Sequence, residues 1–323
     1  MSAPCAVCGN AEGNRLHEAR EMMFGLRDVF TYLECAGCGC VQLTDPPADP
    51  SRYYPSDYYA YAEGGPGRWE GLRSRLKGSR ARARLQGGDP LGAVLLRLLG
   101  TTPRLEWLAW MGLGFEASIL DVGCGAGELL QELRRDGFRD LQGIDPFIAA
   151  DLDLGGGLRI HRRGLAEHAG THDLVMLHHS LEHMPDQQDV FGHLQRLVRP
   201  GGWLLIRIPV TDSSAWREYG VDWVQLDAPR HLFLHSCKSL DRLASAAGFQ
   251  RRRLLHDSTG FQFWGSEQYR RDVPLRDPRS LASRPARPLF GRGRLAEFER
   301  RARALNAAGE GDQAVFFFQI PPS

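Results

Sequence analysis

Lysine is almost absent from this 323-residue sequence, which has it only at Lys77 and Lys238 and carries nearly all of its positive charge as arginine. The formal net charge of +1 gives no general electrostatic attraction for nucleic acid. The sequence also lacks any run approaching the roughly 18 apolar residues that span a bilayer, and its N-terminus has no apolar secretory segment. These absences predict a cytoplasmic protein, and the length predicts one sizeable domain with a smaller one.

Cysteine is scarce too, and its seven residues do not form the pattern of a secreted disulfide framework. Two pairs stand out, Cys5 with Cys8 and Cys35 with Cys38, and each is a C-x-x-C followed by glycine. Four thiolates suit tetrahedral zinc with no open position, so the pairs predict a structural zinc ribbon over residues 1–45. Cys40 is an alternative ligand, and redox chemistry is the competing interpretation.

Residues 46–104 differ in composition from both flanks. Five tyrosines lie between Tyr53 and Tyr61 among prolines and glycines, and so many aromatic side chains usually pack on something. We expect this connector to fold over the mouth of an active site, with a plain linker as the alternative. Residues 68–84 then hold seven basic residues and one acid before the apolar LGAVLLRLLG. They predict a solvated helical segment, with peripheral membrane contact through residues 68–100 as the alternative.

From residue 105 onward, apolar strands alternate with amphipathic helices. This alternation predicts an α/β domain over residues 105–323 with a doubly wound, mostly parallel seven-stranded sheet. The predicted strands are 118–122, 141–145, 158–161, 173–177, 203–208, 252–256 and the C-terminal AVFFFQI. The predicted helices are one from residue 105, then 127–136, 185–198 (stopped by Pro200 and Gly201) and 236–247. The arginine- and proline-rich residues 274–312, with a helix near 295–305, predict an insertion before the last strand.

Three alternate glycines, Gly123, Gly125 and Gly127, follow the strand at 118–122 and precede a helix. Glycines in such a turn let the backbone approach a ligand closely, and an acid at the tip of the next strand, here Asp145, can bind a ribose diol. The spacing G-x-G-x-G, preceded by Asp121, differs from the dinucleotide fingerprint.

Four segments together resemble class I S-adenosylmethionine-dependent methyltransferases: LDVGCGAGELL, GIDP, HDLVMLHHSLEHMPD and LVRPGGWLLIRIP. The cysteine knuckles, YYPSDYY and APRHLFLHS narrow the resemblance to bacterial zinc-ribbon methyltransferases, many of them associated with surface-glycan or natural-product sugar pathways. The resemblance implies a Rossmann-like methyltransferase fold, S-adenosylmethionine as cofactor and a structural Zn²⁺. It also implies a small-molecule, sugar-type acceptor that is nucleotide- or lipid-linked.

The same resemblance assigns cofactor-binding roles. It implies that the three glycines pack against the methionine part of the cofactor, that Asp121 orients their turn, and that Asp145 binds the ribose hydroxyls. Residues after the third strand surround the adenine, and a histidine ends the fourth strand at the mouth of the site. The further cofactor-binding candidates at these two places are Leu165, Ala166, Glu167 and His178.

Methyl transfer to a hydroxyl needs an in-line approach and a base, and histidine titrates near neutral pH. The candidate bases are His179, His183 and His231, each of which could instead be a packed or capping residue. His231 gains weight from Arg230 and Trp223, which could clamp an anionic sugar nucleotide and stack on a ring.

His179, Glu182 and His183 also spell H-x-x-E-H, the zinc signature of inverted metallopeptidases. That signature belongs within a helix, whereas here the first histidine ends a strand and Pro185 begins the next helix. The peptidase interpretation is therefore disfavoured. Chance matches are common for a motif of this length. A bound metal that helps to deprotonate a sugar hydroxyl is more plausible than the peptidase interpretation, although less so than a chance match.

Two other functions compete with small-molecule methylation. RNA methylation, with the ribbon as a recognition module, is disfavoured because the first 45 residues contain only three arginines and no lysine. A catalytically silent binding protein is disfavoured by the intact glycines and Asp145. The sequence leaves open the acceptor, the methylated atom and the oligomeric state.

Overall fold

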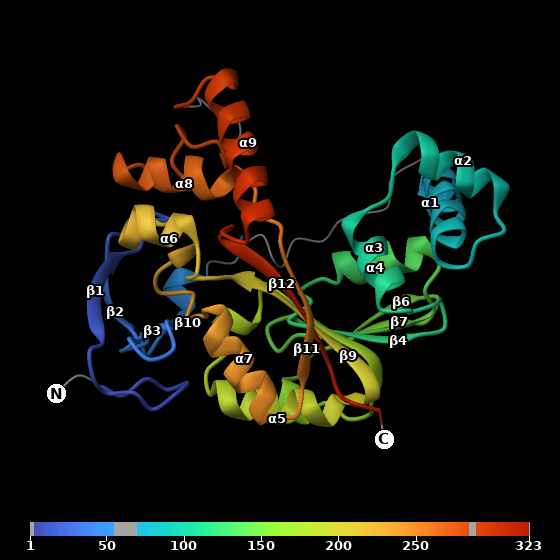
Figure 1. The fold of residues 1–323 in the computed structure, drawn as a ribbon, viewed down its shortest axis with the longest axis horizontal. Helices are drawn as coiled ribbons and strands as arrows, with labels where there is room; N and C mark the ends of the chain where they lie inside the picture. The colour runs from blue at the N-terminus through green and yellow to red at the C-terminus, as the bar shows by residue number, and fades with distance from the viewer. Residues whose placement is uncertain (1–2, 55–69, 284–288, 323) are drawn as a thin grey trace. The chain divides into compact units, whose positions relative to one another are not determined.

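The computed structural model describes residues 3–54, 70–283 and 289–322 (Figure 1). The chain divides into two compact units, each built from segments distant in sequence. Unit 1 comprises Met1–Pro55, His179–Gly192 and Ile206–Phe318, and unit 2 comprises Ser56–His178, His193–Leu205 and Gln319–Ser323. Residues 55–69, which hold most of the predicted tyrosine-rich connector, lie outside the described residues.

A mixed sheet contains eight of the described strands, one more than the seven predicted, in the order β11-β12-β9-β8-β4-β5-β7-β6. β4 pairs in parallel with β5 and β8, and β5 pairs in parallel with β7. The additional strand is β6, which pairs antiparallel with β7. Their bounds are β4 Ser118–Val122, β5 Asp140–Ile144, β6 Leu152–Gly155, β7 Leu158–His161, β8 His172–His178, β9 Val198–Pro209, β11 Gln250–His256 and β12 Gln313–Gln319.

The strands form where apolar residues are continuous, as expected for a sheet covered on both faces. In β12, the three phenylalanines of AVFFFQI are buried as predicted, whereas Gln319 at its end is half-buried and Ile320 lies beyond the strand. β9 is longer than predicted. The helix before it, α5 (Gln187–Leu197), ends as expected, but Pro200 and Gly201 lie within the first residues of β9.

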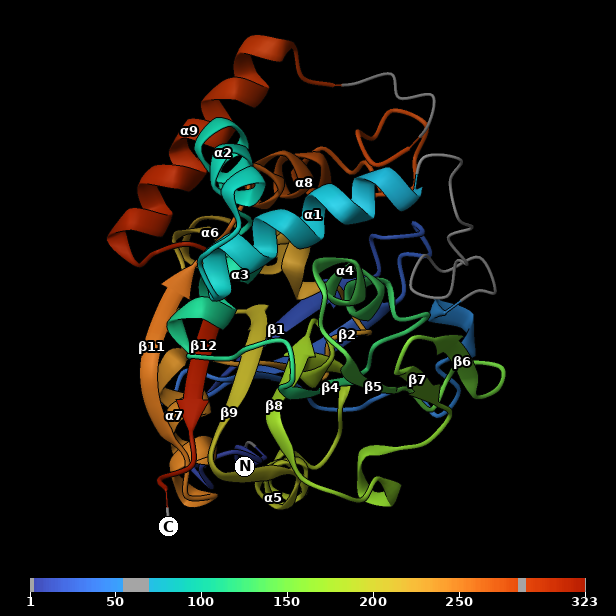
Figure 2. The same ribbon diagram turned by 90° about the vertical axis from the view of Figure 1, so that its right-hand side faces the viewer.

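Unit 2 contains the helices α1 (Glu70–Leu85), α2 (Pro90–Leu99), α3 (Pro103–Trp110) and α4 (Glu128–Asp136). α4 packs on β5 and β7, and Figure 2 shows α1 running past α3 and α4, with which it is in contact. Several arginines of the basic segment are paired rather than free: Arg82 with Asp89, and Arg84 with Glu106. In the described part of the chain, no helix combines the length and apolar character needed to cross a membrane.

Unit 1 contains a four-stranded antiparallel sheet of β1 (Arg15–Arg20), β2 (Val29–Glu34), β3 (Val41–Leu43) and β10 (Phe233–Leu234) (Figure 1). The fourth strand comes from almost 200 residues further along the chain, so the sequence alone did not predict it. The helices of this unit are α6 (Ser214–Tyr219), α7 (Cys237–Ala246), α8 (Phe261–Arg270) and α9 (Arg292–Ala308).

An aromatic core joins the small sheet to α6, α8 and α9. It includes Tyr32 from β2, Trp216 from α6, Phe263 from α8 and Phe298 from α9, all buried. The predicted insertion 274–312 therefore contributes to this core through α9, because Phe298 stacks on Phe263 at a ring-centroid distance of 5.6 Å.

Candidate functional site

The turn between β4 and α4 has a backbone conformation that favours glycine. Gly123, Gly125 and Gly127 have φ angles of 76°, 52° and 77°, a region that side chains with a Cβ rarely adopt. At Gly127 a Cβ would also lie 2.2 Å from the Cδ1 of Ile160 in β7. The residue pattern noted in the sequence thus has a steric cause as well as a ligand-binding interpretation.

Asp145 fastens this turn to the end of β5. Its Oδ2 accepts the N–H of Gly125 at 3.0 Å, and its Oδ1 accepts the N–H of Phe147 at 2.8 Å. The N–H of Gly123 adds a bond of 2.8 Å to the carbonyl of Ile144. Each oxygen of an ionised carboxylate has two acceptor positions. Asp145 can therefore still accept hydrogen bonds from two hydroxyl groups.

Asp121 lies beside Asp145 at the end of β4 and is 3% exposed. Burial, with the nearby charge of Asp145 as a second cause, raises the pKa of Asp121 to about 7. Protonation of Asp121 near neutral pH limits the repulsion between the two carboxyl groups behind the glycine turn.

The other predicted cofactor residues follow strands of the same parallel set. Leu165, Ala166 and Glu167 form a 3₁₀ turn after β7, and His178 is the last residue of β8. Because β4, β5, β7 and β8 run in parallel, their carboxyl ends meet at one edge of the sheet, where ligands of open α/β sheets bind. Their contact with a cofactor stays a prediction.

Unit 1 brings the three candidate bases into one cluster around Glu182. The Nδ1 of His179 lies 3.3 Å from the Glu182 Oε1, and its Nε2 accepts a hydrogen bond of 3.0 Å from Arg207. Both ring nitrogens of His179 are thus engaged. The H-x-x-E-H motif does not lie within an α-helix, because Leu181–His183 forms only a single 3₁₀ turn, which argues against the peptidase interpretation.

His183 and His231 share a different arrangement. Each Nδ1 lies within hydrogen-bonding distance of a backbone carbonyl, at 2.8 Å from Arg230 for His183 and at 2.7 Å from Gln225 for His231. A carbonyl only accepts, so both Nδ1 atoms carry a proton, and in the neutral form each ring keeps its lone pair on Nε2. The rings meet edge to face at 4.8 Å. Burial lowers the pKa of His231 to about 4, which keeps it neutral.

Arg230 and Trp223 do not have the roles predicted for them. Arg230 is 1% exposed and is bound to Asp227 at 2.6 Å and to Glu21 at 3.0 Å, so it cannot clamp an anionic substrate. Trp223 is fully buried and donates its indole N–H to Asp312 at 2.9 Å. Both residues are structural.

Sequence reasoning missed two neighbours of the histidines. The hydroxyl of Tyr54 lies 3.3 Å from the Nδ1 of His183, and Arg207 bonds to both His179 and Asp257. Tyr54 belongs to the tyrosine-rich segment expected near the active site, which was its only signal. Arg207 had none, because an arginine near the end of a strand is unremarkable in this arginine-rich chain.

The four predicted zinc ligands form one sulfur cluster. The Sγ atoms lie 3.7 Å apart between Cys5 and Cys38, and 3.5 Å apart between Cys8 and Cys35. Four sulfurs at about 2.3 Å from a tetrahedral zinc lie roughly 3.8 Å from one another, so the geometry fits this ion. All four Sγ atoms lie within 4.8 Å of one another, and Cys40, although buried, is not in the group.

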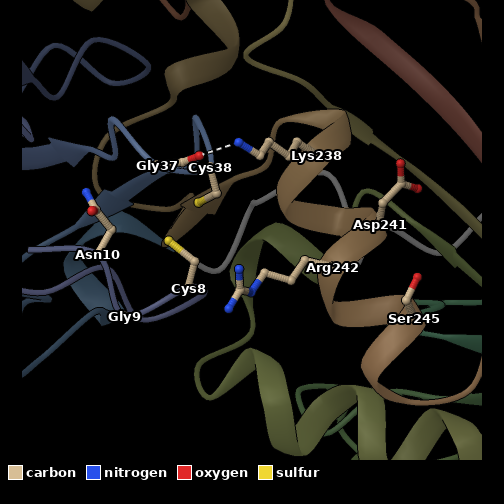
Figure 3. A pocket seen from close by; sticks show the side chains of 9 residues that line it. All are labelled: Cys8, Gly9, Asn10, Gly37, Cys38, Lys238, Asp241, Arg242 and Ser245. Carbon is tan, nitrogen blue, oxygen red and sulfur yellow. Dashed lines mark hydrogen bonds between the residues drawn. The ribbon is translucent and has the colours of Figure 1, made fainter.

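The two knuckles have the same backbone turn, and α7 is bonded to the second of them. In each, the N–H of Gly9 or Gly39 bonds at 2.8 Å to the carbonyl of the first cysteine of its pair. Figure 3 shows Lys238 and Arg242 extending from α7 towards the knuckles. Together with residues of both knuckles, they line a hollow of about 560 Å³. Lys238 donates a hydrogen bond of 2.6 Å to the carbonyl of Gly37.

Residues 78–254 match the methyltransferase-domain family. The chain is 33% identical over 161 residues to a ubiquinone biosynthesis O-methyltransferase of Bordetella avium, a match covering 44% of this chain and 66% of that protein. It is 34% identical over 125 residues to one of Erwinia tasmaniensis, covering 35% and 51%. The matches thus span less than two thirds of each relative. A solved methyltransferase from Archaeoglobus fulgidus is similar with a TM-score of 0.41 and 14% identity, covering 74% and 97%.

The raised pKa of Asp121 makes stability depend on pH. In the unfolded chain an aspartate titrates near pH 4, so between about pH 4 and 7 only the folded state retains this proton. Stability from this group is therefore lost as the pH rises through that window. Asp121→Asn cannot ionise. Its free energy of unfolding relative to the wild type should rise by about 2–4 kcal/mol between pH 4.5 and 8, measured by urea denaturation of the cofactor-free protein. A difference that stays constant with pH would contradict the assignment.

Proposed function

This chain belongs to the methyltransferase-domain family, and on that premise we propose that it transfers a methyl group from S-adenosylmethionine to a small-molecule acceptor. The observation that carries the proposal is the family match over residues 78–254, which contains the glycine turn and Asp145. We assign the cofactor to unit 2, with the methionine end over the turn and the ribose on Asp145. The geometry supports this assignment, because Asp145 retains acceptor capacity while its bonds hold the turn.

The acceptor atom that we propose is a hydroxyl oxygen. The relatives are named as O-methyltransferases, which supports this choice. In the reaction the oxygen forms a bond to the methyl carbon, the carbon–sulfur electron pair stays on sulfur, and the hydroxyl proton must leave. The cluster of His179, His183 and His231 is the proposed place for its removal. A sugar or glycan intermediate is the acceptor class suggested by the zinc-ribbon resemblance.

A structural zinc held by the four cysteines completes the proposal. The spacing of the sulfurs supports it, as do the backbone turn in each knuckle and the bond from Lys238 of α7 to the second knuckle. For the segment 68–100 we keep peripheral membrane contact as a proposal. The exposed apolar side chains of α2 support it: Leu91, Val94, Leu98 and Leu99.

RNA methylation is the alternative function, and the salt dependence of RNA binding distinguishes it from small-molecule methylation. RNA binding depends steeply on salt because counterions are released from phosphates, whereas small-molecule methylation requires no RNA affinity. Binding to bulk RNA that falls with added salt would favour the alternative.

Replacing Asp145 should weaken cofactor binding. Asp145→Ala removes a charged acceptor for the ribose hydroxyls and a partner of the glycine turn, so calorimetry should find the affinity for S-adenosylmethionine reduced by about 1.5–3 kcal/mol. Glu116→Ala removes an exposed acid before β4, at the opposite end of that strand from the glycine turn, and serves as the control with no expected effect on affinity. Unchanged affinity in Asp145→Ala would overturn the cofactor assignment.

Metal analysis of extensively dialysed protein should find about one zinc per chain. The double variant Cys5→Ser with Cys8→Ser should lose it together with stability, because two thiolates cannot hold the ion. Cys237→Ser, which changes a cysteine outside the cluster, should keep it. Zinc-free protein that is folded and active would refute the ribbon.

Replacing histidines of the cluster should slow turnover without affecting the cofactor. His183→Ala and His231→Ala should each lower turnover by about 10²–10⁴ and leave S-adenosylmethionine affinity nearly intact, because only the transition state loses an interaction. His17→Ala, in a His–Glu pair elsewhere in unit 1, is the control. If these two variants and His179→Ala all keep near-wild-type turnover on an identified acceptor, the cluster takes no part in proton removal.

A further inference from the structure

Besides the four cysteines, Glu182, His183 and His231 form a group of metal-ligand side chains in unit 1. One ligand atom from each lies within 4.8 Å of the others. The group differs from the H-x-x-E-H motif, because His231 takes the place of His179. His179 is unsuited as a ligand, since its Nε2 accepts from the cationic Arg207.

The carboxylate of Glu182 is the strongest sign that something is bound here. Glu182 is 0% exposed, and its Oε2 makes no hydrogen bond with the residues that the structure describes. Its Oε1 is in ion-pair contact with the Nδ1 of His179 at 3.3 Å, so the second oxygen is the one left without a partner. Buried polar groups normally have hydrogen-bond partners, and a desolvated carboxylate without them is costly unless a cation compensates it.

Both histidines are already in the tautomer that a metal requires. Each donates Nδ1–H to a backbone carbonyl and keeps a lone pair on Nε2. Metal-bound histidines commonly have such a partner on the other nitrogen, because it fixes the tautomer and the ring orientation. The Nε2 of His231 is 4.0 Å from the nearest oxygen of Asp227, too far for a hydrogen bond that would occupy it.

The backbone holds the two segments of the group together. The N–H of Leu232 donates to the carbonyl of Glu182 at 2.7 Å, and the hydroxyl of Tyr32 donates to the carbonyl of His231 at 2.9 Å. The segment 225–232 is therefore fixed beside Glu182 without the cation, which reduces the rearrangement needed for binding.

We propose that Glu182, His183 and His231 bind one divalent cation, separate from the zinc of the cysteines, and that this cation takes the acceptor hydroxyl as a further ligand. Two histidines and one carboxylate leave coordination positions open, as in non-haem iron and catalytic zinc sites. Ligand atoms at about 2.1 Å from an ion lie roughly 3–3.5 Å apart. Side-chain rotations that move the ligand atoms by about 1 Å would therefore bring all three within bonding distance of one ion.

The role of the cation rests on the proposed function. An oxygen bound to a cation loses its proton more readily. The proton then leaves to solvent, the oxygen electron pair forms the bond to the methyl carbon, and the sulfonium keeps the carbon–sulfur pair as S-adenosylhomocysteine. His183 and His231 would then act as ligands, and their substitution would slow turnover through loss of the cation.

The test is a titration of the zinc-loaded, full-length protein with Mn²⁺, followed by the loss of the electron paramagnetic resonance signal of free Mn²⁺. Mn²⁺ favours oxygen and nitrogen ligands over thiolates, so it does not report on the cysteine cluster. The wild type should bind one Mn²⁺ per chain, and Glu182→Gln should weaken Mn²⁺ binding by about 10-fold to 100-fold. His17→Gln, at a His–Glu pair with only one histidine, should bind as the wild type does.

Folding of each variant is checked by its melting temperature. If Glu182→Gln does not fold, His183→Gln decides, because His183 is only partly buried. No saturable Mn²⁺ binding in the wild type, or equal binding in the folded ligand variants, would overturn the proposal. S-Adenosylmethionine affinity is measured in parallel. Mn²⁺ binding without cofactor binding would refute the proposed function and leave the cation site standing, whereas the reverse result would refute the cation site alone.

Discussion

The guanidinium of Arg230 is buried between the carboxylates of Asp227 and Glu21, at 2.6 Å and 3.0 Å. Its pKa is raised because the attraction of these two acids outweighs the effect of burial. A buried charge without partners is strongly destabilising, so this arrangement requires the N-terminal residues and the segment 227–231 to remain together. The carbonyl of Arg230 in turn accepts the Nδ1–H of His183. The histidine cluster of unit 1 depends on this ion network for its geometry.

Unit 2 also places charged groups close together, in this case two acids. Asp121 and Asp145 lie at the ends of adjacent strands, where two negative charges repel each other. Asp145 accepts two backbone N–H groups, whereas Asp121 is buried and has a raised pKa. Asp121 can therefore stay neutral beside the carboxylate that holds the glycine turn. Position 127 needs a residue without a Cβ, because the side chain of Ile160 lies against it.

Local patterns in the sequence were enough to predict many of the strands and turns of unit 2. The strands 118–122 and 158–161 have the predicted bounds, and the glycine turn joins the predicted strand and helix, because apolar runs and glycine turns act over a few residues. The pairing of β10 with β3 could not be predicted, since it joins residues almost 200 positions apart. The same limit applies to His231, whose position beside Glu182 depends on the bond from Leu232. Arg230 and Trp223 were misjudged because sequence does not reveal that a polar or aromatic residue is buried with partners.

We propose that unit 2 holds the cofactor through Asp145 and the glycine turn. The most direct test is a crystal structure of the protein with S-adenosylhomocysteine. The ribose hydroxyls should lie within about 3.2 Å of the Asp145 carboxylate, with the amino-acid end of the ligand over Gly123 to Gly127. A ligand bound elsewhere, or a ribose with no contact to Asp145, would contradict the account.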